Sequence, residues 1–101
     1  NNVAYVMNEV LDFDQAVAEA LRFADQDGQT LVIVTADHET GAMALTGGSE
    51  KDGMLKANFG SKGHSGIMVP VYAYGPQSQL FGGIYQNTEL SDKIKSLLEK
   101  R

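Results

Sequence analysis

Cysteine and tryptophan are absent from the 101 residues, and proline occurs only twice. Without cysteine the chain can form neither a disulfide nor a thiolate metal site, so histidines and carboxylates are its only plausible strong metal ligands. Basic residues are few as well, with eight scattered Lys and Arg against 13 Asp and Glu and a formal net charge of -5. Because nucleic acids are held by clustered Lys and Arg, this balance argues against a nucleic-acid partner.

Long apolar runs are also missing, since none approaches the roughly 20 residues that a membrane-spanning helix needs. No signal peptide opens the chain, which starts at Asn1 without a methionine. This start predicts a cut inside a longer protein. The length of 101 residues and the hydrophobic content of 43% predict one domain with one core.

Helical periodicity dominates the first part of the chain. The segment Asp12–Asp27 has apolar residues at helical spacing, and its charged residues fall mostly between them. Asp12 and Gln15 have the spacing of a capping box, and Gly28 can supply the left-handed stop of the helix. The pattern therefore predicts an amphipathic helix over Asp12–Asp27.

Three segments have the composition of strands. Residues 31–34 are a continuous run of Leu, Val and Ile, which predicts a strand buried on both faces in a parallel sheet. Residues 42–45 predict a shorter strand, and residues 67–74 a strong one that Gly75 and Pro76 end. Pro70 places this last strand at an edge or a bulge, because proline cannot donate a ladder hydrogen bond.

The remaining segments complete the pattern. Residues 47–63 are rich in glycine and predict a long loop or a small hairpin that could close over a ligand. Thr88 can cap a final helix over residues 89–100, which has one apolar stripe. Helices alternating with buried strands predict the α/β class, a layered structure with a mainly parallel sheet.

Candidate metal ligands follow the first strand. Asp37 and His38 lie just past the end of residues 31–34, where ligands of parallel sheets bind. His64 is the second of only two histidines, and all three side chains stand among small residues. Carboxylate and imidazole are preferred zinc donors, and adjacent residues in a turn can both reach one ion. The pattern predicts a divalent-metal site that includes Asp37, His38 and His64.

Other interpretations of these residues stay open. Asp37 can simply cap the following turn, with His38 exposed on the surface, and glycine-flanked histidines such as His64 are common in loops. Glu39 can be a ligand, a solvated residue or, as we favour, a support for a metal-bound imidazole. Ser65 lies next to His64 but lacks the glycines of a nucleophile elbow, so we do not assign it as a nucleophile.

A resemblance to a known family emerges from these segments together. Thr30–Gly41, TLVIVTADHETG, closely resembles the metal-binding strand and turn of alkaline phosphatases. It is joined in the same order by LDFDQAVAEALRFA before it and by GHSGIMVPVYAYGP and LFGGIYQNTEL after it. The resemblance covers essentially the whole chain and is loosest over residues 48–62.

The resemblance implies a zinc-dependent phosphomonoesterase with two zinc ions and a magnesium, acting through a phosphoserine intermediate on phosphate monoesters. Its fold would be a three-layer α/β/α sandwich with a mainly parallel central sheet. Asp37 and His38 match the pair on the zinc that activates the serine, and His64 matches a histidine on the neighbouring zinc. The serine nucleophile, the phosphate-gripping arginine and the magnesium ligands match no residue of this chain.

Residues 1–101 are accordingly expected to be the C-terminal segment of an alkaline-phosphatase-like domain, with the catalytic serine upstream and no turnover by the segment alone. The expected partners are the upstream part of the same protein and further copies of the chain. The resemblance also implies a periplasmic or secreted location. Two alternatives remain: a related phosphodiesterase or sulfatase-type hydrolase, and a non-catalytic fragment that binds metal or drives assembly.

Overall fold

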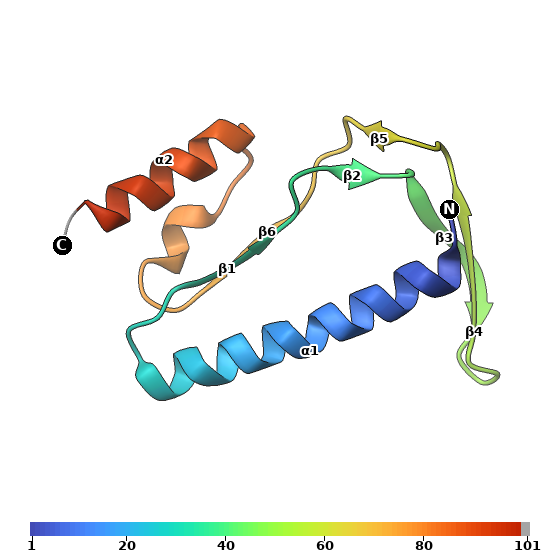
Figure 1. The fold of residues 1–101 in the computed structure, drawn as a ribbon, viewed down its shortest axis with the longest axis horizontal. Coiled ribbons are helices and arrows are strands. Elements are labelled where there is room, and N and C mark those ends of the chain that lie inside the picture. The colour runs from blue at the N-terminus through green and yellow to red at the C-terminus, as the bar shows by residue number, and fades with distance from the viewer. Residues whose placement is uncertain (100–101) are drawn as a thin grey trace. The chain divides into compact units, whose positions relative to one another are not determined.

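The computed structural model describes residues 1–99, which form two helices, one short 3-10 helix and six strands (Figure 1). These elements divide between two compact units. The first unit comprises Asn1–Val17 and Thr35–Pro70, and the second comprises Ala18–Val34 and the chain from Val71 onward. Each unit is described by itself below.

Helix α1 spans Val3–Asp27 and is the longest element. The Asn2 side chain accepts a hydrogen bond from the Tyr5 amide at 3.1 Å, which satisfies one of the unpaired amides of the first turn. The expected start at Asp12 is therefore wrong, and Asp12 lies inside the helix. The expected stop is confirmed, because Gly28 has a φ of 69° and its amide donates to the Ala24 carbonyl at 2.8 Å.

In the second unit, β1 (Val32–Thr35) and β6 (Val71–Tyr74) form a two-stranded sheet. The side chains of β1 are half-buried or exposed, so the expected burial on both faces is not found in the described residues. Strand β6 begins directly after Pro70, later than the expected start at residue 67, because proline cannot donate to the ladder. Gly75 ends it as expected, with a φ of 104°.

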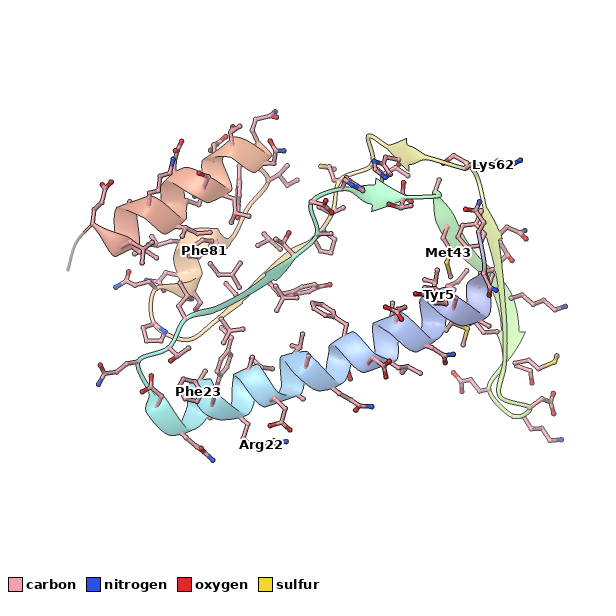
Figure 2. The ribbon with its side chains drawn as sticks, viewed as in Figure 1. Tyr5, Arg22, Phe23, Met43, Lys62 and Phe81 are labelled. Atoms are coloured by element: carbon pink, nitrogen blue, oxygen red, sulfur yellow. The ribbon has the colours of Figure 1, made fainter. Side chains whose placement is uncertain are left out.

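The rest of the second unit packs around one aromatic side chain. The 3-10 helix η1 (Ser78–Phe81) contacts β6 and helix α2 (Asn87–Leu98). Phe81, labelled in Figure 2, is only 2% exposed. The Gln86 amide donates to Glu89 Oε1 at 3.2 Å, so Gln86 rather than Thr88 is the cap of α2. The expected helix over residues 89–100 is otherwise confirmed up to Leu98, and residue 100 lies outside the described residues.

The first unit contains a hairpin of β3 (Met43–Ser49) and β4 (Met54–Phe59). The strands pair antiparallel with Met43 opposite Phe59, and a register shift lies between Leu45 and Gly47. Residues 47–63 were expected to form a loop or a small hairpin, and the hairpin is confirmed. The strand expected over residues 42–45 is longer than predicted, since it continues into the glycine-rich segment.

The described residues combine two helices with six strands, which agrees with the α/β class. Their sheets each have two strands, and the β2–β5 and β3–β4 pairs are antiparallel. The mainly parallel sheet of a three-layer sandwich is not formed by residues 1–99 themselves. Buried side chains are also scarce within this range, where Ala24 and Phe81 are the buried hydrophobic residues. No helix within residues 1–99 has the length and apolar character to cross a bilayer.

Candidate metal-ligand site

The candidate ligands of the first unit lie at a pair of two-residue strands. Asp37 and His38 immediately precede β2 (Glu39–Thr40), and His64 is the first residue of β5 (His64–Ser65). The strands pair antiparallel, with Glu39 opposite Ser65 and Thr40 opposite His64 (Figure 1). This pairing brings together two segments that are 26 residues apart in the sequence.

The two imidazoles stack face to face. The ring centroids of His38 and His64 lie 3.5 Å apart, and the ring planes differ by 25°. Because the nitrogen lone pairs of an imidazole lie in the plane of its ring, stacking leaves them directed outward from the pair. The structure thus brings together both histidines that the sequence nominated as ligands.

His38 is oriented by its own turn. Its Nδ1 lies 3.2 Å from the Glu39 carbonyl oxygen and 3.3 Å from Thr40 Oγ1. A proton on Nδ1 that is donated to the Glu39 carbonyl leaves the Nε2 lone pair available. Metal-bound histidines are commonly held in this way, with one ring nitrogen donating to a carbonyl. The Nδ1-protonated tautomer, which donates to the Glu39 carbonyl, is the one in which Nε2 can bind a cation.

Asp37 lies beside Nε2, the other ring nitrogen of His38. Its Oδ1 accepts a hydrogen bond from the His38 amide at 3.0 Å, and its Oδ2 is 3.3 Å from His38 Nε2. The Asp37 side chain is 85% exposed and that of His38 is 38% exposed. A carboxylate oxygen and an imidazole nitrogen thus converge at a solvent-accessible point.

A second polar pair lies across the same strands. Ser65 Oγ donates a hydrogen bond to Glu39 Oε2, and both residues are half-buried. The contact from Glu39 to the His38 ring is made by the backbone carbonyl of Glu39. The side-chain carboxylate of Glu39 instead accepts the hydrogen bond from Ser65. The sequence suggested a support role for Glu39 but not this partner, because nothing in the sequence pairs residue 39 with residue 65 before the register is known.

Gly41 joins the strand pair to the hairpin. Its amide donates to the Gly63 carbonyl at 2.8 Å, and its own carbonyl accepts from the Gly60 amide at 2.9 Å. Its φ is 82°, and a Cβ at this position would lie 2.8 Å from Phe59 Cδ1. A side chain is therefore excluded both by conformation and by space, and Gly41 fixes the residue before His64 to the end of β2.

The donor set has the chemistry of a zinc site but is incomplete. One carboxylate and two imidazoles are ordinary zinc ligands, whereas stable zinc sites use three or four protein ligands around one ion. Within residues 1–99 no group of three or more His, Cys, Asp or Glu side chains is arranged to hold one metal ion. The three side chains therefore fit partial ligand sets, not a closed site.

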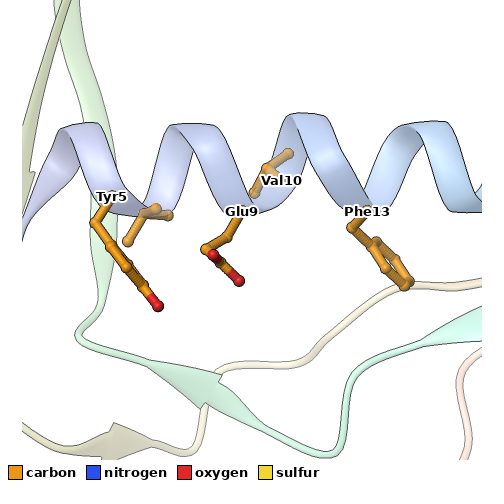
Figure 3. A pocket seen from close by; sticks show the side chains of 5 residues that line it. Tyr5, Glu9, Val10 and Phe13 are labelled. Atoms are coloured by element: carbon orange, nitrogen blue, oxygen red, sulfur yellow. The ribbon is translucent and has the colours of Figure 1, made fainter.

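Another surface feature of the first unit is an apolar depression of about 410 Å³ on α1 (Figure 3). It is lined by Tyr5, Val6, Glu9, Val10 and Phe13. Glu9 is its one ionisable group besides the Tyr5 phenol, and neither histidine contributes to it. The depression carries no set of groups for catalysis.

In the second unit one titratable group is clearly perturbed. The Tyr74 hydroxyl donates a short hydrogen bond to Asp25 Oδ1. This hydrogen bond, the negative charge of Asp25 and partial desolvation together raise the pKa of Tyr74 above its ordinary value of 10.0. The contact ties β6 to the C-terminal part of α1 and does not involve the candidate ligands.

Comparison with known proteins gives consistent matches. Residues 1–58 match the family model described as alkaline phosphatase. Alkaline phosphatase H of Pseudomonas aeruginosa is 40% identical over 94% of this chain and 23% of its own length. Alkaline phosphatase of Escherichia coli K12 is 36% identical over 91% and 23%, and streptomycin-6-phosphate phosphatase of Streptomyces griseus is 32% identical over 94% and 25%.

Solved structures agree with these matches. The alkaline phosphatase from the Antarctic bacterium TAB5 superposes with a TM-score of 0.88 at 45% identity, covering 98% of this chain and 30% of that chain. A mutant of the same enzyme with Mg bound in its M3 site gives a TM-score of 0.87 at 42% identity, covering 98% and 31%. The chain thus spans about a quarter of the curated relatives it matches and nearly a third of the solved chains.

Proposed function

Because the chain belongs to the alkaline phosphatase family, we propose that it forms part of a zinc-dependent phosphomonoesterase and supplies Asp37, His38 and His64 as metal ligands. The observation that carries the proposal is that His38 contacts both of the other two candidate ligands. The His38 and His64 rings stack at 3.5 Å, and Asp37 Oδ2 lies 3.3 Å from His38 Nε2.

The three ligands divide between two zinc ions in this proposal. Asp37 and His38 are adjacent and would hold one ion, while His64, on the facing strand, would bind the neighbouring ion. When bound, two neighbouring zinc ions would supply positive charge for the entering and leaving oxygens of an in-line displacement at phosphorus. The remaining zinc ligands, and those of a magnesium, come from parts of the protein outside these 101 residues.

Neighbouring groups in this chain orient the side chains of Asp37 and His38. The His38 amide holds Asp37 Oδ1, so the other carboxylate oxygen faces the imidazole. When His38 is protonated at Nδ1, the Glu39 carbonyl accepts a hydrogen bond from Nδ1–H, and Nε2 stays available as a ligand. Thr40 Oγ1 restrains the same ring from a second direction at 3.3 Å. Together these contacts hold the ligands before any cation arrives, which lowers the ordering cost of binding.

The reaction is hydrolysis of a phosphate monoester in two displacements. A serine oxygen of the protein attacks phosphorus, and the ester oxygen leaves as the alcohol after taking up a proton. Water then attacks the phosphoserine, releasing inorganic phosphate and restoring the serine hydroxyl. The serine lies outside this chain, as do the other parts of a three-layer sandwich. A periplasmic or secreted location and a homo-oligomeric state belong to the same proposal.

The test uses the protein as its gene encodes it. We expect hydrolysis of an aryl phosphate, loss of this activity in a chelator and recovery with zinc and magnesium. His38→Ala should weaken zinc binding by more than about 100-fold, since even outer partners of a ligand are worth 10–100-fold. Zinc content and competition with a chromophoric chelator measure the binding step apart from turnover.

Glu50→Ala provides the matched control, because Glu50 is exposed in the hairpin turn and belongs to no candidate site. Its zinc affinity and activity should equal those of the unmodified protein. The 101-residue chain alone should show no turnover even with both metals added. Family-like turnover by that chain, or unchanged zinc affinity in His38→Ala, would contradict the proposal.

A further inference from the structure

The β2–β5 pair carries different side chains on its two faces. Successive residues of a strand point to opposite faces, and directly opposed residues of an antiparallel pair share a face. Thr40 and His64 are opposed and share one face, and His38, two residues before Thr40, contacts Thr40 Oγ1 from the same side. Glu39 and Ser65 are opposed on the other face, where their side chains bond to each other.

The register of such a short pair depends on a few contacts, of which the backbone hydrogen bond from Gly41 to Gly63 at the end of β2 is one. Two residues on each strand offer few ladder hydrogen bonds, and a slip by one residue would move every side chain to the opposite face. After such a slip His64 would no longer oppose Thr40 and could not stack on His38. A side-chain bond between opposed residues penalises the slip, because Glu39 and Ser65 must stay opposite each other to make it.

The chemistry of this bond suits the task. Ser65 Oγ donates to a carboxylate oxygen, and charge-assisted hydrogen bonds are about twice as strong as neutral ones. Both residues are half-buried, whereas His38 and His64 are exposed, so the bond lies on the drier face of the pair. Each partner is also directly joined to a candidate ligand, Glu39 to His38 and Ser65 to His64.

We infer that the Glu39–Ser65 hydrogen bond is a register lock, and that both are positioning residues that hold the two imidazoles face to face for metal binding. The inference rests on the proposed function for the metal, but the lock itself is a property of the metal-free chain. It acts through the backbone of β2 and β5, and neither side chain contacts the cation.

The experiment compares Glu39→Ala, Ser65→Ala and the double variant in the protein as its gene encodes it. Each single variant should lose about 10–100-fold in zinc affinity, the range seen when outer partners of ligands are removed. The double variant should lose no more than either single variant, because both changes delete one bond. In the metal-free protein, each variant should also lose the nuclear Overhauser contacts between the two imidazole rings.

Conservative variants and a control separate positioning from folding. Glu39→Gln and Ser65→Thr retain an acceptor and a donor, so both should recover most of the zinc affinity and the ring contacts. Glu50→Ala should change neither quantity. Additive losses in the double variant, or ring contacts that survive Glu39→Ala, would overturn the lock while leaving the proposed function intact. Failure of the unmodified protein to bind zinc would overturn the proposed function and the lock's role toward metal.

Discussion

The interactions that stabilise the first unit internally differ from those that stabilise the second. The second unit encloses an aromatic side chain, with Phe81 only 2% exposed. The first unit buries no large side chain, and its site is held by polar links such as Gly41 to Gly63 and Ser65 to Glu39. Apolar packing is tolerant of direction, whereas hydrogen bonds fix it. The unit that contains the candidate ligands therefore relies on the directional interaction.

Phe81→Ala should produce the largest loss of stability. Truncation of a buried phenylalanine removes its transfer free energy and leaves a cavity, at a cost of about 3–5 kcal/mol in the free energy of unfolding. Urea denaturation of the unmodified and variant proteins measures the difference. Phe23→Ala is the matched control, because Phe23 lies in the same unit and is 61% exposed. Similar losses in both variants would break the contrast between the units.

Gly41→Ala should cause the next largest loss of stability, and this loss should arise in the first unit. The new methyl group would meet Phe59 Cδ1 at 2.8 Å and force a non-glycine residue to a φ of 82°. Strain of this kind costs about 1–3 kcal/mol. Gly53→Ala separates the two causes, since Gly53 also has a positive φ of 61° but no atom lies within 4 Å of its added Cβ.

The two glycine variants should also differ in zinc affinity. Gly41→Ala should weaken it, because the displaced Gly41 amide bonds to the residue before His64, whereas Gly53→Ala should leave it unchanged. Competition with a chelator measures both values. Equal effects of the two variants would show that the positive φ alone matters and that the approach to Phe59 does not.

The smallest expected effect concerns Tyr74 in the second unit. The hydrogen bond to Asp25 raises the pKa of Tyr74 in the folded state above the ordinary value of 10.0. A raised folded pKa stabilises the protein fully below pH about 10, and the stabilisation disappears as the pH rises through the folded pKa. Tyr74→Phe should therefore flatten the fall in melting temperature between pH 9 and 12. Tyr72→Phe, at an exposed tyrosine of the same strand, should retain it.

The sequence predicted which helices and strands form better than it predicted where they begin and end. The first helix was expected to start at Asp12 because Asp favours caps, but Asn2 caps it and the apolar spacing continues upstream through Val3 and Val6. The predicted ends of α1 at Gly28 and of β6 at Gly75 are correct, since a positive φ is a property that local sequence encodes. The expected burial of residues 31–34 depended on neighbours that residues 1–99 do not supply.

The site shows the same division between local and long-range information. Asp37 and His38 were predicted as metal ligands from their residue types and their position after a strand. His64 was predicted as a ligand from its imidazole and from the resemblance to alkaline phosphatases. The stacking of His38 on His64 and the bond from Ser65 to Glu39 depend on the β2–β5 register. No local pattern encodes a register between segments so far apart, so the sequence could indicate the candidate ligands but not the contacts that hold them.

The β3–β4 hairpin has a consequence for the order in which the chain folds. It occupies most of the stretch between His38 and His64, and its open end pairs Met43 with Phe59. Isolated hairpins form in about 1–10 μs, and once this one has closed, the link still to be ordered between the two histidines shrinks to a few residues on each side. Since the entropic cost of closing a loop grows with its length, formation of the hairpin lowers the cost of pairing β2 with β5.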